Sequence, residues 1–109
     1  MNIYFNNEPV IQQVKVANNF VKKFFGLMGK RSMNCNEGLL LLNCPSIHCF
    51  FMKIPIDAVY LSKDLEVLAI ETINPWRMGR RYKDVSHVLE LEEGNGIKFS
   101  VGDQLILCE

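Results

Sequence analysis

The stretch AVYLSKDLEVLAIETI, residues 58–73, decides the fold expected for this chain. Its two ends, 58–61 and 67–73, are apolar and contain several β-branched and aromatic residues, which favour strands. The four residues between them, Ser62 to Leu65, have the composition of a turn. Two such runs joined by a short turn predict a β-hairpin.

Further short apolar runs, separated by turn residues, extend this prediction along the chain. Residues 38–42 are apolar without alternation, which suits a strand buried on both faces. We expect residues 47–61 to form an inner wall of the sheet, with Pro55 and Asp57 shaping its bend. The other segments expected as strands are 3–5, 10–16, 85–91, 97–101 and 104–108.

One helix is expected in the N-terminal half. Phe20, Phe24, Leu27 and Met28 recur at the spacing of one helical face and form a single apolar stripe. Roughly six to eight short strands with one helix predict a mainly β fold, a small β-sandwich or barrel-like structure. Because 109 residues is the usual length of one domain, we expect a single domain over residues 1–109.

Composition and charge exclude several classes of protein. Twelve Lys and Arg balance twelve Asp and Glu, so the whole chain lacks the cationic field of a dedicated nucleic-acid-binding protein. The apolar runs are too short for a transmembrane segment. The first residues do not resemble a signal peptide, which predicts a cytoplasmic location. Basic residues gather before residue 37 and acidic ones after residue 83, so we expect these segments to lie close together.

The four cysteines do not form a metal motif. Cys35, Cys44, Cys49 and Cys108 contain no Cys-x-x-Cys pair, and zinc knuckles need such short-spaced pairs. Buried, reduced thiols are the expectation. The sequence predicts no metal and no cofactor.

Several motifs occur in a characteristic order along the chain: Gly26-Leu27-Met28-Gly29-Lys30-Arg31, Glu37-Gly38-Leu39-Leu40-Leu41, residues 48–60 with Met52-Lys53 and Pro55-Ile56-Asp57, Asn74-Pro75, Leu89-Glu90-Leu91 and Gly102-Asp103. Their order and spacing resemble those of the domain-of-unknown-function 192 family of bacteria and archaea. The resemblance covers about residues 14–107. It implies a mainly β, sandwich- or barrel-like fold and, by the family's own name, no established activity. Because members often carry an export signal, it also leaves an envelope location open.

Residues with binding chemistry gather in two parts of the chain. An apolar wall beside one cation suits an amphipathic ligand that bears a carboxylate or phosphate. Asp57 has two interpretations, a general base or a turn cap that accepts backbone N–H bonds. The candidate ligand-binding residues are His48, Phe51, Met52, Lys53, Asp57, Trp76 and Arg77.

Residues 75–83 combine four cations with Trp76 and Tyr82 in an expected loop. One interpretation is a docking surface for an anionic partner, because guanidinium groups and rings bind phosphate, carboxylate or bases. The other is a solvated loop whose arginines cover Trp76 and pair with the acidic C-terminal segment.

Three functions follow from these residues. The first is a non-enzymatic binding or accessory module with an apolar cleft near Phe51, Met52 and Lys53. The second is a small enzyme that uses Asp57 with His48 or His87 as acid and base. The third is an adaptor that docks an anionic partner through residues 75–83. Expected partners are therefore a small amphipathic or anionic ligand, or a protein.

Overall fold

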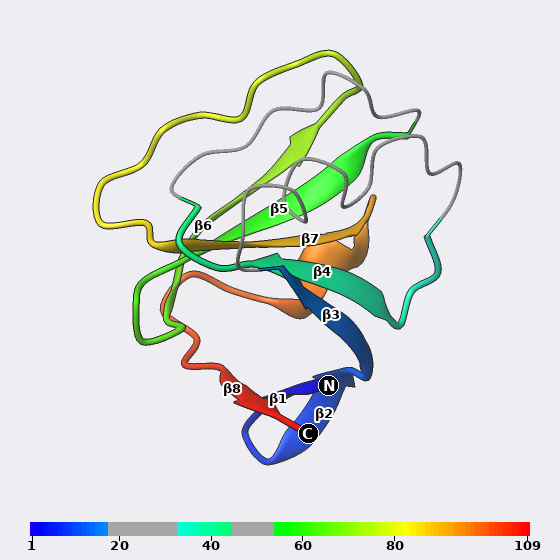
Figure 1. Cartoon of the computed structure of the whole chain (residues 1–109), viewed down its shortest axis with the longest axis vertical. Coiled ribbons are helices and arrows are strands. Elements are labelled where there is room, and N and C mark those ends of the chain that lie inside the picture. Colours follow the sequence, from blue (N-terminus) through cyan, green and yellow to red (C-terminus); the bar gives the residue numbers. More distant parts are fainter. Residues whose placement is uncertain (18–32, 45–53) are drawn as a thin grey trace.

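The structure is a computed structural model that describes residues 1–17, 33–44 and 54–109. It is mainly β, with two sheets stacked on one another (Figure 1). The smaller sheet has the order β2-β1-β8 and the larger has the order β3-β4-β7-β5-β6. The elements are β1 (Asn2–Phe5), β2 (Glu8–Ile11), β3 (Gln13–Ala17), β4 (Glu37–Leu41), β5 (Ile56–Leu61), β6 (Val67–Ile73), β7 (His87–Glu92), the 3-10 helix η1 (Asn95–Lys98) and β8 (Ile106–Cys108).

The predicted hairpin is formed by β5 and β6. The two strands pair antiparallel, and Val59 lies opposite Ile70. In the turn, the Ser62 hydroxyl accepts hydrogen bonds from the backbone N–H groups of Asp64, at 3.3 Å, and Glu66, at 3.1 Å. A serine that bonds to backbone groups a few residues on is a typical turn device, and it fixes where the hairpin reverses.

The smaller sheet brings the two ends of the chain together. Asn6 and Asn7, both with positive φ, join β1 to β2, as a two-residue hairpin turn requires. On its other side, β1 pairs antiparallel with β8, and Ile3 lies opposite Leu107. Figure 1 shows both termini at the edge of this sheet. The two end segments of the chain therefore meet, whereas four of the five basic residues before position 37 lie outside the described residues.

The core between the two sheets depends on Gly38 of β4, where side chains of both sheets come close to the backbone. Ile3 and Ile11 of the smaller sheet pack with residues of the larger one, among them Leu40 and Leu89. A Cβ on Gly38 would lie 3.1 Å from Leu91 Cδ2 and 3.4 Å from Ile11 Cγ2. A larger side chain in β4 would therefore push the sheets apart.

The opposite face of the larger sheet carries a second apolar cluster. Because side chains alternate along a strand, Leu39, Ala58, Tyr60 and Val88 face this side while their neighbours face the smaller sheet. Met33, Val85 and the partly buried Tyr82 pack onto the same cluster from outside the sheet. The central strands are thus buried on both faces.

Some expectations were wrong and others lie outside the described residues. Residues 97–101 do not form a strand: η1 and a turn occupy this stretch, and Ile97 is 90% exposed. The expected strand over 10–16 is two strands, β2 and β3, with a break at Gln12. Cys35 and Cys108 are exposed, whereas buried thiols were expected. The expected helix over 20–28, the strand over 47–52 and Cys49 lie outside the described residues.

In the described ranges, no helix combines the length and apolar character needed to cross a bilayer. Within the same ranges, no cluster of three His, Cys, Asp or Glu side chains suits a metal ion.

Candidate functional site

Asp57 in β5 is buried and holds three hydrogen bonds on the face toward the smaller sheet. Its Oδ1 accepts a bond from the Thr72 hydroxyl at 2.6 Å. Its Oδ2 accepts bonds from the backbone N–H groups of Gly94, at 2.9 Å, and Gly96, at 2.8 Å. The prediction that Asp57 caps a turn through backbone N–H bonds is confirmed, and its carboxylate fixes the start of η1 against the sheet.

The glycines of this turn allow the contact. Gly94 has a φ of 94°, a backbone conformation that other residues adopt at a cost. A Cβ on Gly96 would lie 2.8 Å from Asp57 Oδ2 and 2.9 Å from Ile70 Cγ2. Only a residue without a side chain lets the backbone come this close to the carboxylate.

His87 lies far from Asp57 along the sheet. In the register of β5 and β7, Asp57 faces Leu91 while His87 faces Leu61. Four residues along a strand separate the two positions by about 13 Å, too far for a direct proton transfer. His87 Nδ1 accepts a hydrogen bond from the Asn43 backbone N–H at 3.0 Å instead. An acid and base pair of Asp57 and His87 is not assembled.

Glu90 is the second buried carboxyl group of the larger sheet, and it lies on the opposite face. It is in the centre of β7, between Leu39 of β4 and Ala58 of β5 in the cross-strand register. Only 5% of its surface is exposed. Desolvation by burial raises the pKa of Glu90 from 4.5 to about 8, so at neutral pH the carboxyl group carries its proton.

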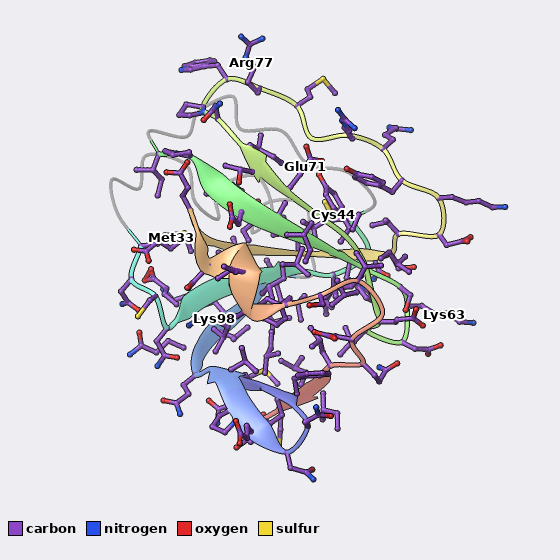
Figure 2. All side chains as sticks on the ribbon, turned by 180° about the vertical axis from the view of Figure 1, so that it is seen from behind. Met33, Cys44, Lys63, Glu71, Arg77 and Lys98 are labelled. Atoms are coloured by element: carbon purple, nitrogen blue, oxygen red, sulfur yellow. The ribbon has the colours of Figure 1, made fainter. Side chains whose placement is uncertain are left out.

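Residues 75–83, here called the basic loop, lie on the outside of the molecule. Arg77, Arg80, Arg81 and Lys83 are exposed. Trp76 and Met78 are each 62% exposed. Figure 2 shows Arg77 on the outer edge of the structure, with its side chain directed away from the sheets.

Two contacts tie the basic loop to the sheet. Glu71 Oε2 of β6 accepts hydrogen bonds from the Tyr60 hydroxyl, at 2.7 Å, and from the Arg80 backbone N–H, at 2.9 Å. The rings of Tyr82 and Tyr60 pack with their centroids 4.8 Å apart. The loop is therefore held at its centre and near its end.

The start of the basic loop is a turn that places Trp76 in the left-handed region. The Arg77 N–H donates to the Asn74 carbonyl at 3.2 Å, which closes the turn. Pro75 occupies its second position and Trp76, with a φ of 65°, its third. A positive φ at this position usually belongs to Gly or Asn. A large aromatic side chain is thus held outward at a cost of about 1 kcal/mol in backbone strain.

The predicted ligand-binding residues do not form one group in the described structure. Trp76 and Arg77 are neighbours in the basic loop, whereas Asp57 lies on the other face of the larger sheet. His48, Phe51, Met52 and Lys53 lie outside the described residues. A ligand role for all seven stays a prediction.

Sequence reasoning missed Glu90 as a buried group. Its alternation with Leu89 and Leu91 indicated a strand with one polar face, but both faces of β7 are covered. The available signal was its place inside the apolar run 88–91, where a charged residue is unusual on a central strand.

With two packed sheets and little helix, the described structure is that of a small, mainly β protein. Its sequence identifies the family. The sequence model of the domain-of-unknown-function 192 family, described as "Uncharacterized ACR", matches residues 3–107. This chain belongs to that family, and the resemblance noted from its motifs is confirmed.

Relatives agree with this assignment, and a solved structure shares the fold. A protein of Pyrococcus furiosus named as a UPF0127 protein is 30% identical over 98 residues, which covers 85% of this chain and 84% of the relative. A UPF0127 protein of Pyrococcus horikoshii is 31% identical with 85% of each chain covered. A crystal structure of a protein of unknown function from Novosphingobium aromaticivorans matches the fold with a TM-score of 0.83. That match covers 97% of this chain and 82% of the other at 18% identity. The family has no established activity.

Proposed function

We propose that this protein is a non-enzymatic binding module that docks an acidic protein segment through the basic loop. One observation carries the proposal. Four exposed cations stand beside two exposed apolar side chains, and in the described part of the chain no ion pair involves these cations. Cations that have no acidic partner among the described residues are available to carboxylates of another molecule.

The anchoring of the loop supports a docking role. Because Glu71 and Tyr82 fix the loop on the sheet, its side chains start from a defined backbone. A partner then loses less conformational entropy than it would in ordering a free loop. Arg and Trp are also the residue types that most often dominate binding energy at protein interfaces.

An acidic protein segment fits this surface better than a nucleic acid. The chain carries no net charge, and the acidic residues after position 83 would repel a long phosphate backbone. Trp76 and Met78 offer apolar contacts that suit a peptide with carboxylates and apolar side chains together. We therefore expect a short segment of alternating acidic and apolar residues.

The test measures fluorescence anisotropy of a labelled peptide of alternating Glu and Leu at low salt. We expect saturable binding that weakens as salt screens the charges. Arg77→Ala with Arg80→Ala should reduce the affinity about tenfold or more, since each lost charge contact at an interface costs about 1 kcal/mol. The double variant Lys15→Ala with Lys63→Ala removes the same charge from exposed positions elsewhere and should leave binding unchanged.

Three outcomes would overturn the proposal. The first is no binding of the acidic peptide at low salt. The second is an equal loss of affinity in both double variants, because binding would then depend only on net charge. The third is binding of single-stranded oligo-dT with no binding of the peptide, which would favour a nucleic-acid surface instead.

The apolar cleft predicted near Phe51, Met52 and Lys53 stays a second part of this proposal, for an amphipathic ligand. The bonding of Asp57 to backbone groups argues against the enzyme alternative that used it as an acid or base. The binding module is therefore the function that we propose.

A further inference from the structure

Asn95 and Gly96, at the start of η1, form the only Asn-Gly pair in the sequence. In such a pair the backbone nitrogen of the second residue can attack the side-chain amide of the first, because glycine has no side chain to hinder the approach. Asparagine is accordingly among the residues that limit the lifetime of proteins at high temperature. Every other asparagine of the chain is followed by a residue with a side chain. Asn95 is therefore the asparagine that the sequence favours for deamidation.

Deamidation closes a ring and then opens it. The Gly96 nitrogen loses its proton to hydroxide and bonds to Asn95 Cγ, the Cγ–Nδ2 bond breaks, and ammonia leaves with a proton taken from water. Water then opens the cyclic succinimide at either carbonyl and gives aspartate or isoaspartate. The ring forms only when rotation about the Asn95 Cα–C bond turns the Gly96 nitrogen toward the side chain. A residue in a 3-10 helix has a ψ of about −20 to −30°, which directs that nitrogen away from Cγ.

The hydrogen bonds of η1 hold both reacting groups. The Gly96 N–H donates to Asp57 Oδ2 at 2.8 Å, and the Gly94 N–H donates to the same oxygen at 2.9 Å. The leaving amide is held as well, since Asn95 Nδ2 donates to the Cys35 carbonyl at 2.6 Å. Asn95 is 7% exposed and Gly96 is buried. The ring cannot form while these bonds are intact.

The packing around Gly96 leaves little room for this rotation in the closed structure. A Cβ at this position would lie 2.8 Å from Asp57 Oδ2 and 2.9 Å from Ile70 Cγ2. The Gly96 carbonyl accepts a hydrogen bond from the Phe99 N–H at 3.1 Å, and η1 packs against β5, β6 and β7. The Gly96 nitrogen can therefore turn toward Asn95 Cγ only after η1 has moved away from the sheet.

We propose that Asn95 is a deamidation site that the Asp57 carboxylate blocks, and that it reacts only when η1 separates from Asp57. The rate in the folded protein is then the rate of an unstructured Asn-Gly segment multiplied by the fraction of molecules in which η1 is open. The product carries a carboxylate in place of the Nδ2 donor, so the bond to the Cys35 carbonyl is lost. An η1 that has reacted does not close as before. This inference is independent of the proposed docking of an acidic segment.

The first test compares the unmodified protein with a synthetic peptide of residues 91–99. Both are incubated at mildly alkaline pH, and mass spectrometry with chromatographic separation of the isoaspartyl form follows the loss of Asn95. Amide hydrogen exchange at Gly96 measures the fraction of molecules in which the same segment is open. We expect the protein to react more slowly than the peptide by the protection factor of the Gly96 N–H, within about tenfold.

Two variants separate the opening of η1 from unfolding of the whole chain. Asp57→Ala removes the acceptor of the Gly96 N–H, so we expect Asn95 to react within about tenfold of the free peptide. Leu40→Ala is the matched control, because it removes a buried side chain from the core between the sheets and leaves the Asp57 bonds in place. Asn95 in this control should react at least about tenfold more slowly than in Asp57→Ala. Circular dichroism checks that both variants are folded during the incubation.

Four results would overturn the proposal. Loss of Asn95 as fast in the folded protein as in the peptide means that η1 does not block the reaction. A rate that departs from the Gly96 protection factor by far more than tenfold means that opening and reaction are separate events. Equal rates in the two folded variants mean that the reaction needs unfolding of the whole chain. A folded Asp57→Ala protein that reacts no faster than the unmodified one means that Asp57 is not the blocking group. If Asp57→Ala does not fold, the comparison of the unmodified protein with its peptide decides alone.

Discussion

Asp57 and Glu90 are two buried carboxyl groups on neighbouring strands of one sheet, and they differ in every contact. Asp57 faces the smaller sheet and accepts three hydrogen bonds. Glu90 faces the other way, among apolar side chains, with burial raising its pKa to about 8. Hydrogen-bond donors offset the cost of burying a carboxyl group, whereas desolvation alone raises its pKa and favours the protonated form. The first arrangement stabilises the fold, and the second costs stability.

The largest effect of a single substitution at one pH should follow from removal of the carboxylate with three hydrogen bonds, that of Asp57. Asp57→Ala leaves two backbone N–H groups and one hydroxyl without their acceptor. We expect a loss of about 4 kcal/mol in the free energy of unfolding, since a buried donor left unpaired costs about 1 to 3 kcal/mol. Chemical denaturation followed by circular dichroism measures it. Thr72→Val is the control, because it removes only one of the three bonds and should cost about 1 kcal/mol. A loss below about 1 kcal/mol in Asp57→Ala would show that the bonds to η1 do not hold the fold.

The second effect is the dependence of the free energy of unfolding on pH, to which Glu90 contributes. The pKa of its carboxyl group is about 8 in the folded protein and 4.5 in the unfolded chain. Between these values the folded state holds a proton that the unfolded state has lost, so the folded state binds more protons. Stability must therefore fall as pH rises across this window, by about 1.4 kcal/mol per pH unit, and level off above it.

The Glu90→Gln variant isolates the contribution of Glu90 to the pH dependence of stability. Gln has similar size and does not titrate, so the difference between the two proteins in free energy of unfolding should change with the stated slope from pH 5 to pH 8. Urea unfolding at several pH values supplies the curves. If the two proteins keep a constant difference over this range, Glu90 is not held protonated by the fold.

The third and smallest effect tests how closely η1 approaches the Asp57 carboxylate. Gly96→Ala places a Cβ 2.8 Å from Asp57 Oδ2 and should destabilise the protein by about 2 kcal/mol. Gly94→Ala meets no atom within 4 Å, but Gly94 has a φ of 94°, so only backbone strain of about 1 kcal/mol is expected. Thermal unfolding of both variants shows which substitution destabilises the protein more. The reverse order would mean that the contact with Asp57 is looser than described.

The sequence predicted the parts of the fold that local chemistry determines. The β5–β6 hairpin followed from two apolar runs and the turn residues between them, and the burial of β4 on both faces followed from its unbroken apolar run. The sequence also indicated that Asp57 accepts backbone N–H bonds, but it did not indicate that the donors are Gly94 and Gly96, which lie 37 and 39 residues away. In each case the deciding contacts lie within the segment or involve a backbone group.

The parts of the fold and of the site that could not be predicted depend on contacts between segments that are distant in the sequence. Residues 97–101 have the composition of a strand, but Asp57, from β5, draws the N–H groups of Gly94 and Gly96 and turns the chain into η1. The position of Glu90 depended on which strands cover both faces of β7, which alternation along one strand does not reveal. The exposure of Trp76 required knowledge of the turn that carries it.

The pairing of β1 with β8 has a consequence for the order of folding during synthesis. Asn2 lies opposite Cys108, so the smaller sheet joins residues from the two extremes of the sequence described here. A ribosome makes β8 after the other described strands, and until then β1 and β2 form only a hairpin, which is marginal by itself. The apolar layer between the two sheets therefore closes only after β8 has been made, and a nascent chain exposes that side of the larger sheet until then.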